Sequence, residues 1–289
     1  ERKEVLKMNK EPGRLTTPSE ETSTSGSPLR FLLVLFALSV PFWLLGFFAE
    51  QLAERLPINL PISSLMAVCP LLAALLLVYR ERGSQAAVRL IKKAFAFKRI
   101  RSLAWYLPSL LIMPTILLLS YIIMMVLKKP LPAPDFSFLT VLIFFLVFFI
   151  AAVTEEIGWT GYLYEPLLTK GRFRGIWGTG VFIGAVWGLW HVIPYIQAGN
   201  DPGWIVWQVI ASILNRMLMV WLYCGSGKNF CTGVLYHMMI NVSIFLYPIY
   251  GSFYDPALTS GLLGAVVLMV IIISRIGGSP FYGYRKNTG

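Results

Sequence analysis

The chain has 289 residues, of which 56% are hydrophobic and only 13% carry a charged side chain. A soluble domain carries about 25% charged residues, so this composition excludes an ordinary soluble domain and indicates a membrane protein. The net charge of +11 would suit a nucleic-acid binder, but the cations fall in short segments between apolar runs. Loops of membrane proteins carry such charge, so membrane lipids are expected as partners and nucleic acid is not.

Residues 1–28 are polar and rich in Ser, Thr, Glu and Pro, a composition that predicts a disordered N-terminal tail. A transmembrane helical domain is predicted over residues 29–277, followed by a short C-terminal tail over residues 278–289. A spanning helix needs about 20 mainly apolar residues. Eight segments of the domain fit this pattern: Phe31–Ala49, Leu60–Tyr79, Leu103–Leu127, Phe136–Thr154, Ile176–Ile196, Trp204–Tyr223, Phe230–Pro248 and Ala257–Ser274. The sequence therefore predicts an all-α bundle of about eight transmembrane helices.

The distribution of Lys and Arg predicts the orientation of this bundle. Of the 25 cations, 21 lie on one side of the predicted spans, three lie on the other, and Arg216 lies within a span. Cytoplasmic loops carry the excess of Lys and Arg, so both termini are expected in the cytoplasm. The expected location is an integral multi-pass protein of a prokaryotic cell membrane, or of the endoplasmic reticulum if the organism is eukaryotic.

The second loop contains a possible amphipathic helix. Ser84 could cap a helix over residues 85–100, in which charged residues alternate with an apolar stripe. Such a helix could lie on the inner membrane surface or pack on the bundle as an ordinary connector. The stripe consists of Val88, Ile91, Ala94 and Phe95.

Both histidines of the chain, His191 and His237, lie in apolar segments, and Glu155 and Glu156 follow another. Separately, each has an ordinary explanation, such as a charged helix end or a histidine bonded to a backbone carbonyl. Ionisable groups within a membrane are nevertheless costly and mark functional sites. Asn241 lies four residues after His237, on the same helix face. Because these groups fall on three helices of the C-terminal half, we expect them to form one site.

These residue types suit hydrolysis of a peptide bond. A carboxylate in an apolar site can act as general base toward a water. One histidine could help to hold that water, while the second, with the Asn carboxamide, could donate hydrogen bonds to a developing oxyanion. These are the parts of an amide hydrolase that forms no acyl-enzyme.

The same residues resemble the motifs of a known family. Glu155-Glu156 resembles EExxxR, Trp187 to His191 resembles FxxxH, and His237 to Asn241 matches HxxxN. Their order and eight-helix setting resemble the CPBP family of intramembrane proteases, also called the ABI or CAAX-protease family, which includes CAAX prenyl endopeptidases of the Rce1 type. The resemblance covers roughly residues 136–248, the expected catalytic core.

The resemblance implies a role for each residue. Glu155 would be the catalytic base, His191 would help to position the water, and His237 with Asn241 would stabilise the oxyanion. CAAX-type members cut after a prenylated cysteine and release a C-terminal tripeptide, so a prenylated or membrane-anchored protein substrate is expected. Other members are linked to bacteriocin processing or self-immunity.

The chain departs from these motifs at two positions. Trp187 stands where the motif has Phe, and Thr160 stands where it has the Arg that would pair with Glu156. Arg216, the one cation within a predicted span, could pair with Glu156 across helices, or could bond backbone carbonyls instead. If the lost Arg is not compensated, the chain could be a weak or inactive scaffold or regulator on this fold.

The depth of His191 poses a difficulty. It lies about fifteen residues into the predicted fifth helix, or roughly 22 Å at 1.5 Å per residue, too deep to meet Glu155 at the end of the fourth. Four glycines in the segment would allow a later or broken helix start. They are Gly175, Gly178, Gly180 and Gly184.

Glu155, His191 and His237 would also make a His₂Glu set, a known catalytic zinc composition. The chain lacks HExxH, so the spacing does not demand zinc. The family has been described both as metalloproteases and as enzymes that use a glutamate-activated water, and we favour the metal-free alternative. A transporter with a polar ion relay is a further alternative, but it should show an inverted repeat, and none is evident.

Overall fold

The computed structural model describes residues 26–48, 62–135, 137–170, 173 and 175–276, and over these ranges it contains helices and no strand. The long helices are α1 (Pro28–Phe48), α5 (Tyr106–Val126), α6 (Phe138–Trp159), α10 (Pro202–Gly225) and α12 (Pro256–Ile276). The shorter ones are α3 (Cys69–Arg82), α4 (Ser84–Lys93), α7 (Tyr164–Lys170), α8 (Ile176–Trp190), α9 (Val192–Gln197) and α11 (Phe230–Phe245). Two 3₁₀ segments, η2 (Ile62–Val68) and η3 (Leu103–Trp105), lead into α3 and α5.

Within the described ranges, six helical segments are long and apolar enough to cross a membrane, which fits a polytopic helical membrane bundle. All eight predicted segments contain a helix, but α8 and α11 have only 15 and 16 residues. These two apolar helices are shorter than the segments predicted for them. His237 lies in α11, and His191 directly follows α8. The predicted N-terminal and C-terminal tails lie largely outside the described residues.

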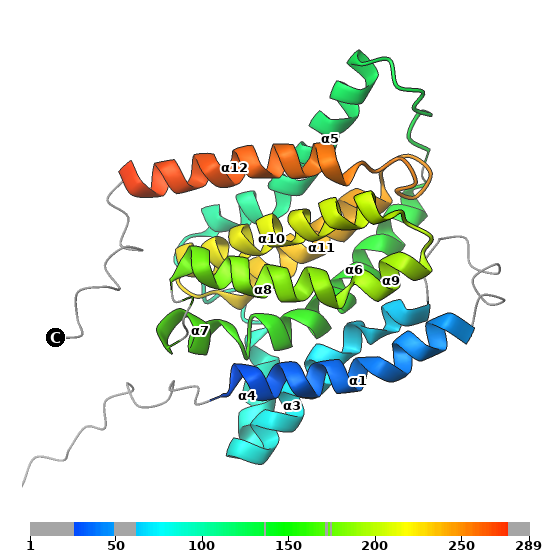
Figure 1. Ribbon diagram of the computed structural model, residues 1–289. Coiled ribbons are helices and arrows are strands. Elements are labelled where there is room, and N and C mark those ends of the chain that lie inside the picture. Colours follow the sequence, from blue (N-terminus) through cyan, green and yellow to red (C-terminus); the bar gives the residue numbers. More distant parts are fainter. Residues whose placement is uncertain (1–25, 49–61, 136, 171–172, 174, 277–289) are drawn as a thin grey trace, which may run out of the picture.

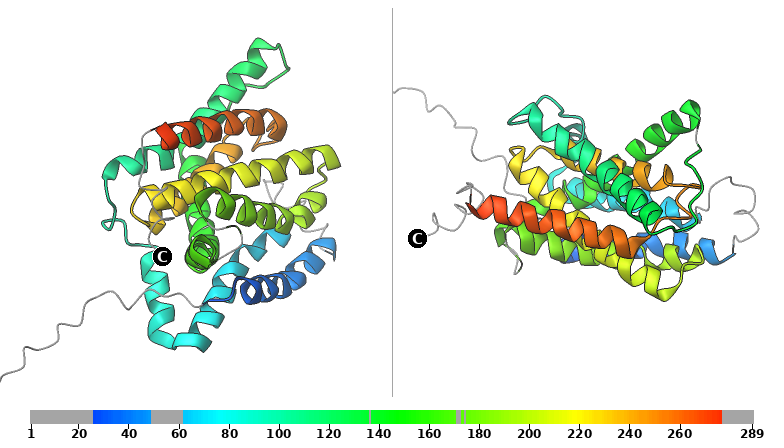
Figure 2. Two further views of the ribbon diagram at one scale, coloured as in Figure 1. Left: turned by 60° about the vertical axis from the view of Figure 1, so that its left-hand side comes forward. Right: turned by 90° about the horizontal axis from the view of Figure 1, so that it is seen from above.

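The central layer of the bundle consists of α8, α10 and α11, as Figure 1 shows. Helices α12 and α5 lie on one side of this layer, and α1 and α3 lie on the other, an arrangement that the turned views preserve (Figure 2). The start of α1 and the end of α12 point toward the same end of the bundle (Figure 1). Which side of the membrane this end faces stays a prediction.

Helices α8 and α10 pack closely because α8 presents a glycine on every turn toward α10. A Cβ added to Gly180 would lie 2.7 Å from Met217 Cα, and one added to Gly184 would lie 2.5 Å from Ile213 Cα. Small residues at a helix interface let two backbones approach in this way. The contact holds Arg216 of α10 directly beside α8, since its Cβ lies 3.1 Å from the same added Cβ on Gly184.

The predicted fifth helix is broken at His191. Helix α8 ends at Trp190 and α9 begins at Val192, because Pro194 lacks the N–H that would bond the carbonyl of Trp190. The expectation that glycines delay or break the start of this helix was wrong, since α8 begins at Ile176. The break instead places His191 at the end of a short helix.

Helix α6 extends five residues beyond its predicted end. It begins after Ser137, whose hydroxyl accepts a hydrogen bond from Thr140 N at 3.1 Å, and it continues to Trp159. The predicted segment ended at Thr154 because the run of apolar residues stops there. They lie inside the helix and are buried, so Glu155 is deeper in the bundle than predicted.

Helix α4 differs from its prediction in both its ends and its buried face. Ser84 is its first residue rather than its cap, Gly83 before it has φ +77°, and the helix ends at Lys93 rather than near residue 100. Its buried positions are Ala86 and Leu90, and Ala94 directly after it is also buried, so this face packs on the bundle. Two members of the predicted apolar stripe, Val88 and Phe95, are 47% and 51% exposed.

Candidate active site

Glu156 lies at the centre of a fully buried polar cluster. Its Oε2 accepts a hydrogen bond from Arg216 Nη1 at 2.8 Å and another from Thr160 Oγ1 at 2.5 Å. Its Oε1 accepts from His237 Nδ1 at 2.8 Å. Three helices thus meet at this carboxylate, because Glu156 comes from α6, Arg216 from α10 and His237 from α11.

The predicted ion pair between Arg216 and Glu156 is confirmed, and both side chains are 0% exposed. The guanidinium also lies under the Trp187 ring, with its Cζ 4.2 Å from the ring centroid. Thr160 occupies the position of the motif Arg and donates its hydroxyl to the same carboxylate one turn earlier. Two residues therefore replace the contacts that the motif Arg would make with Glu156. Thr160 donates a hydrogen bond, and Arg216 supplies the positive charge.

Glu155 has a different environment from its neighbour. Its side chain is 5% exposed, and its Oε2 accepts a hydrogen bond of 2.9 Å from Trp187 Nε1 of α8. Adjacent helical residues point about 100° apart, so the two carboxylates face different neighbours. Glu156 is held by a cation and two other donors, while Glu155 is held by one neutral donor through one of its oxygens.

His191 is fixed in one tautomer by its own helix. Its Nδ1 lies 2.8 Å from the carbonyl oxygen of Trp187, and a carbonyl can only accept, so Nδ1 carries the proton. In the neutral ring, Nε2 is then left as an acceptor. The ring also stacks against Tyr195, one turn further along, with an interplanar angle of 21°.

His237 is oriented by Glu156 in a related way. Because an ionised carboxylate only accepts hydrogen bonds, His237 Nδ1 donates to it, and Nε2 becomes a second donor when the ring is protonated. The side chain is 2% exposed. Asn241 is partly exposed. Because it lies four residues after His237 on α11, the two residues share one helix face.

Trp187 brings these groups together. Its ring centroid lies 5.2 Å from that of His191 and 5.2 Å from that of His237, with both rings edge-on to it. It also bonds Glu155 and covers Arg216. One indole therefore contacts Glu155 of α6, Arg216 of α10, His237 of α11 and His191, which follows α8.

From the sequence, Trp187 was interpreted only as a substitute for the motif Phe, and its bond to Glu155 was not predicted. The signal was present, since an indole N–H placed one turn before His191 must find a partner when buried. The close contact of α8 with α10 was also missed, although Gly180, Gly184 and Gly188 follow each other at four-residue spacing.

The arrangement of donors bears on the possibility of a metal. Over the part of the chain that the structure describes, no three His, Cys, Asp or Glu side chains are grouped so that they could hold a metal ion. The Nδ1 atoms of both histidines are engaged by a carbonyl and by Glu156. These contacts leave the Nε2 atoms unassigned, and the metal-free reaction stays a prediction.

Comparison with known proteins matches this region of the chain. Residues 137–243 match the family model described as type II CAAX prenyl endopeptidase Rce1-like. This range runs from the start of α6 almost to the end of α11 and includes every residue of the cluster. Over this region the chain is similar to the Rce1-like type II CAAX prenyl endopeptidases.

A relative from Methanococcus maripaludis, named CAAX prenyl protease 2, is 23% identical to this chain over 232 residues. The alignment covers 75% of this chain and 83% of the relative. The CPBP family is one of membrane-embedded endopeptidases, in agreement with the integral multi-pass architecture found here.

Proposed function

We propose that this chain is an intramembrane endopeptidase that cleaves a prenylated, CAAX-type protein with a water activated by Glu155. The observation that carries the proposal is the placement of Glu155, His191 and His237 around one buried indole. The match to the Rce1-like family model and the name of the archaeal relative support the substrate class.

Glu155 is assigned the role of general base. Trp187 occupies its Oε2, which leaves Oε1 to take a proton from water. The Nε2 lone pair of His191 accepts the second O–H of that water, so that the oxygen lone pair is directed at the scissile carbonyl carbon. As the C–O bond forms, the carbonyl π electrons move to its oxygen and Glu155 becomes protonated.

His237 and Asn241 are assigned to the oxyanion. The Nε2–H of protonated His237 and the amide of Asn241 donate to the negative oxygen. When the tetrahedral intermediate collapses, the C–N bond breaks and Glu155 returns its proton to the departing amine. The products are a carboxylic acid on the new C-terminus and a free amine on the released peptide.

Glu156 is assigned a supporting role. Its Oε2 pairs with Arg216 and its Oε1 accepts from His237 Nδ1, so it fixes the orientation of the imidazole assigned to the oxyanion. We assign the water chemistry to Glu155 without a metal, and the absence of three grouped ligand side chains among the described residues supports this choice. The buried ion pair supplies the positive charge that the absent motif Arg would supply, which supports an active enzyme over an inactive scaffold.

The decisive experiment uses the purified full chain, reconstituted in lipid, with a prenylated CAAX peptide. Wild type should release the C-terminal tripeptide, and Glu155→Gln, which keeps shape and burial, should lower kcat by at least 10³-fold, as expected for the loss of an essential base. The matched control is Glu165→Gln, a carboxylate on α7 that bonds Tyr223 and Lys228 outside the site. Full activity in Glu155→Gln would overturn the assignment.

A further inference from the structure

Helix α4 connects two membrane spans and stays close to one membrane boundary. The span Ile62–Arg82 ends directly before it, and the span Leu103–Val126 begins after the turns that follow it. Only residues 83–102 separate the two spans. The segment therefore has little freedom to move away from the lipid headgroups at that boundary.

This connection carries a strong excess of positive charge. Between Arg80 and Arg101 the sequence has eight Lys and Arg residues and one carboxylate, Glu81. Five of these cations, which we call the α4 cationic face, are exposed, and among the described residues no carboxylate lies within 4.0 Å of any of them. The α4 cationic face consists of Arg89, Lys92, Lys93, Lys98 and Arg99.

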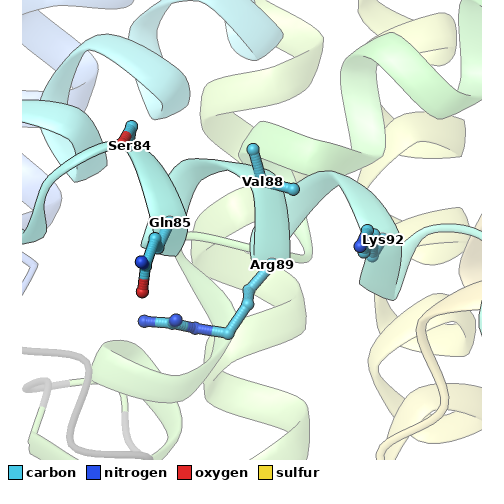
Figure 3. Close-up of a pocket in the computed structure, with 5 residues that line it drawn as sticks. All are labelled: Ser84, Gln85, Val88, Arg89 and Lys92. Carbon is cyan, nitrogen blue, oxygen red and sulfur yellow. The ribbon is translucent and has the colours of Figure 1, made fainter.

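The cations stand beside polar donors and exposed apolar groups. Figure 3 shows a shallow pocket along α4, lined by hydroxyl, amide, guanidinium and ammonium groups and by one aliphatic side chain. Gln85 and Arg89, one turn apart, extend from the same side of the helix (Figure 3). Such a mixture suits a phosphodiester joined to hydrocarbon, because donors meet the phosphate and apolar groups meet the chain. The lining residues are Ser84, Gln85, Val88, Arg89 and Lys92.

The segment is held firmly from within the bundle. Leu90 is 7% exposed, and Cys231 Sγ lies 3.3 Å from the carbonyl oxygen of Ala94. Asn229 Nδ2 donates to the carbonyls of Ala96 and Arg99, at 3.2 and 2.7 Å. Because Asn229 caps α11, the cations are presented by a segment anchored to the helix that carries His237.

We propose that the α4 cationic face binds the headgroups of anionic phospholipids at the membrane boundary. Cations adjacent to a membrane span attract anionic lipids in this way. The alternative is that these charges serve only to orient the protein during insertion, in which case no lipid preference is expected. The proposal concerns binding and does not depend on protease activity.

The test titrates the purified full chain, in a neutral detergent, with phosphatidylglycerol or phosphatidylcholine and counts bound lipids by native mass spectrometry. Wild type should bind phosphatidylglycerol more tightly. In Arg89→Gln/Lys92→Gln/Lys93→Gln, that affinity should fall at least tenfold, with about fivefold expected for each cation lost, while phosphatidylcholine binding stays unchanged. The matched control, Lys128→Gln/Lys129→Gln, removes two exposed cations after α5 and should change the affinity less than twofold.

Thermal unfolding in detergent checks that the triple variant folds, and Arg89→Lys/Lys92→Arg/Lys93→Arg, which keeps the charge, should bind as wild type does. Equal affinity for the two lipids, or equal losses in the triple variant and the control, would overturn the proposal. Displacement of the lipid by an equal concentration of glycerol 3-phosphate would point to a free phosphate site instead. Stronger competition by an acidic peptide would point to a protein partner.

Discussion

Trp187 Nε1 donates a hydrogen bond of 2.9 Å to Glu155 Oε2, and the ring of the same residue covers the guanidinium of Arg216 at 4.2 Å. One side chain thus orients the proposed base and shields the cation that neutralises Glu156. A phenylalanine at this position would keep the second contact and lose the first. Trp187 is therefore a positioning residue in our mechanism rather than a passive substitute for the motif Phe.

Replacing Trp187 by Phe should lower kcat about tenfold and leave KM nearly unchanged, because the carboxylate loses one net hydrogen bond of about 1 kcal/mol and its fixed orientation. The measurement is steady-state kinetics on a prenylated peptide. The matched control is Trp190→Phe, which removes a 2.8 Å indole bond to Ser39 beside the site but none to Glu155. Equal losses of kcat in both variants would assign Trp187 a purely structural role.

Removing the buried cation should destabilise the protein. Arg216→Met leaves Glu156 buried without its charge partner, and breaking such a pair costs about 3–5 kcal/mol in the free energy of unfolding. Glu156→Gln combined with Arg216→Met should recover more than half of that loss, because no unpaired charge remains. Unfolding in detergent measures both variants. A double variant no more stable than Arg216→Met would contradict the ion-pair interpretation.

The glycine contact between α8 and α10 should be sensitive to a single methyl group. Gly184→Ala places a Cβ 2.5 Å from Ile213 Cα and should cost about 1–3 kcal/mol as the helices separate. It should also lower kcat, because Trp187 moves with α8. Gly264→Ala in α12 is the control: nothing lies within 4 Å of its added Cβ, and it should leave thermal stability equal or slightly higher. Equal stability losses in the two variants would refute the packing argument.

Removal of metal should leave the proposed reaction intact. After exhaustive dialysis against a chelator, kcat should stay within twofold of its starting value, because Glu155 activates water without a Lewis acid in our mechanism. Elemental analysis of the same sample checks that zinc is absent, and a zinc protease treated in parallel confirms that the chelator works. Loss of activity that added zinc restores would contradict the mechanism.

The sequence predicted the helical segments well, because the hydropathy of a segment is a local property. It failed at helix ends. The end of α6 was placed at Thr154, where the apolar run stops, and the break at His191 was not foreseen although Pro194 follows it. Because of these errors, His191 was predicted to lie too deep in the membrane to meet Glu155.

What the sequence by itself determined is the membrane class, the helical architecture and the set of costly polar residues, all of which depend on residue type and spacing. Only the tertiary structure decided how they meet. That Arg216 pairs with Glu156, and that Trp187 bonds Glu155, depends on the close approach of α8 and α10 and on two short helices. Contacts between helices depend on where each helix ends and on how the helices pack. The spacing of residues along one helix does not specify either.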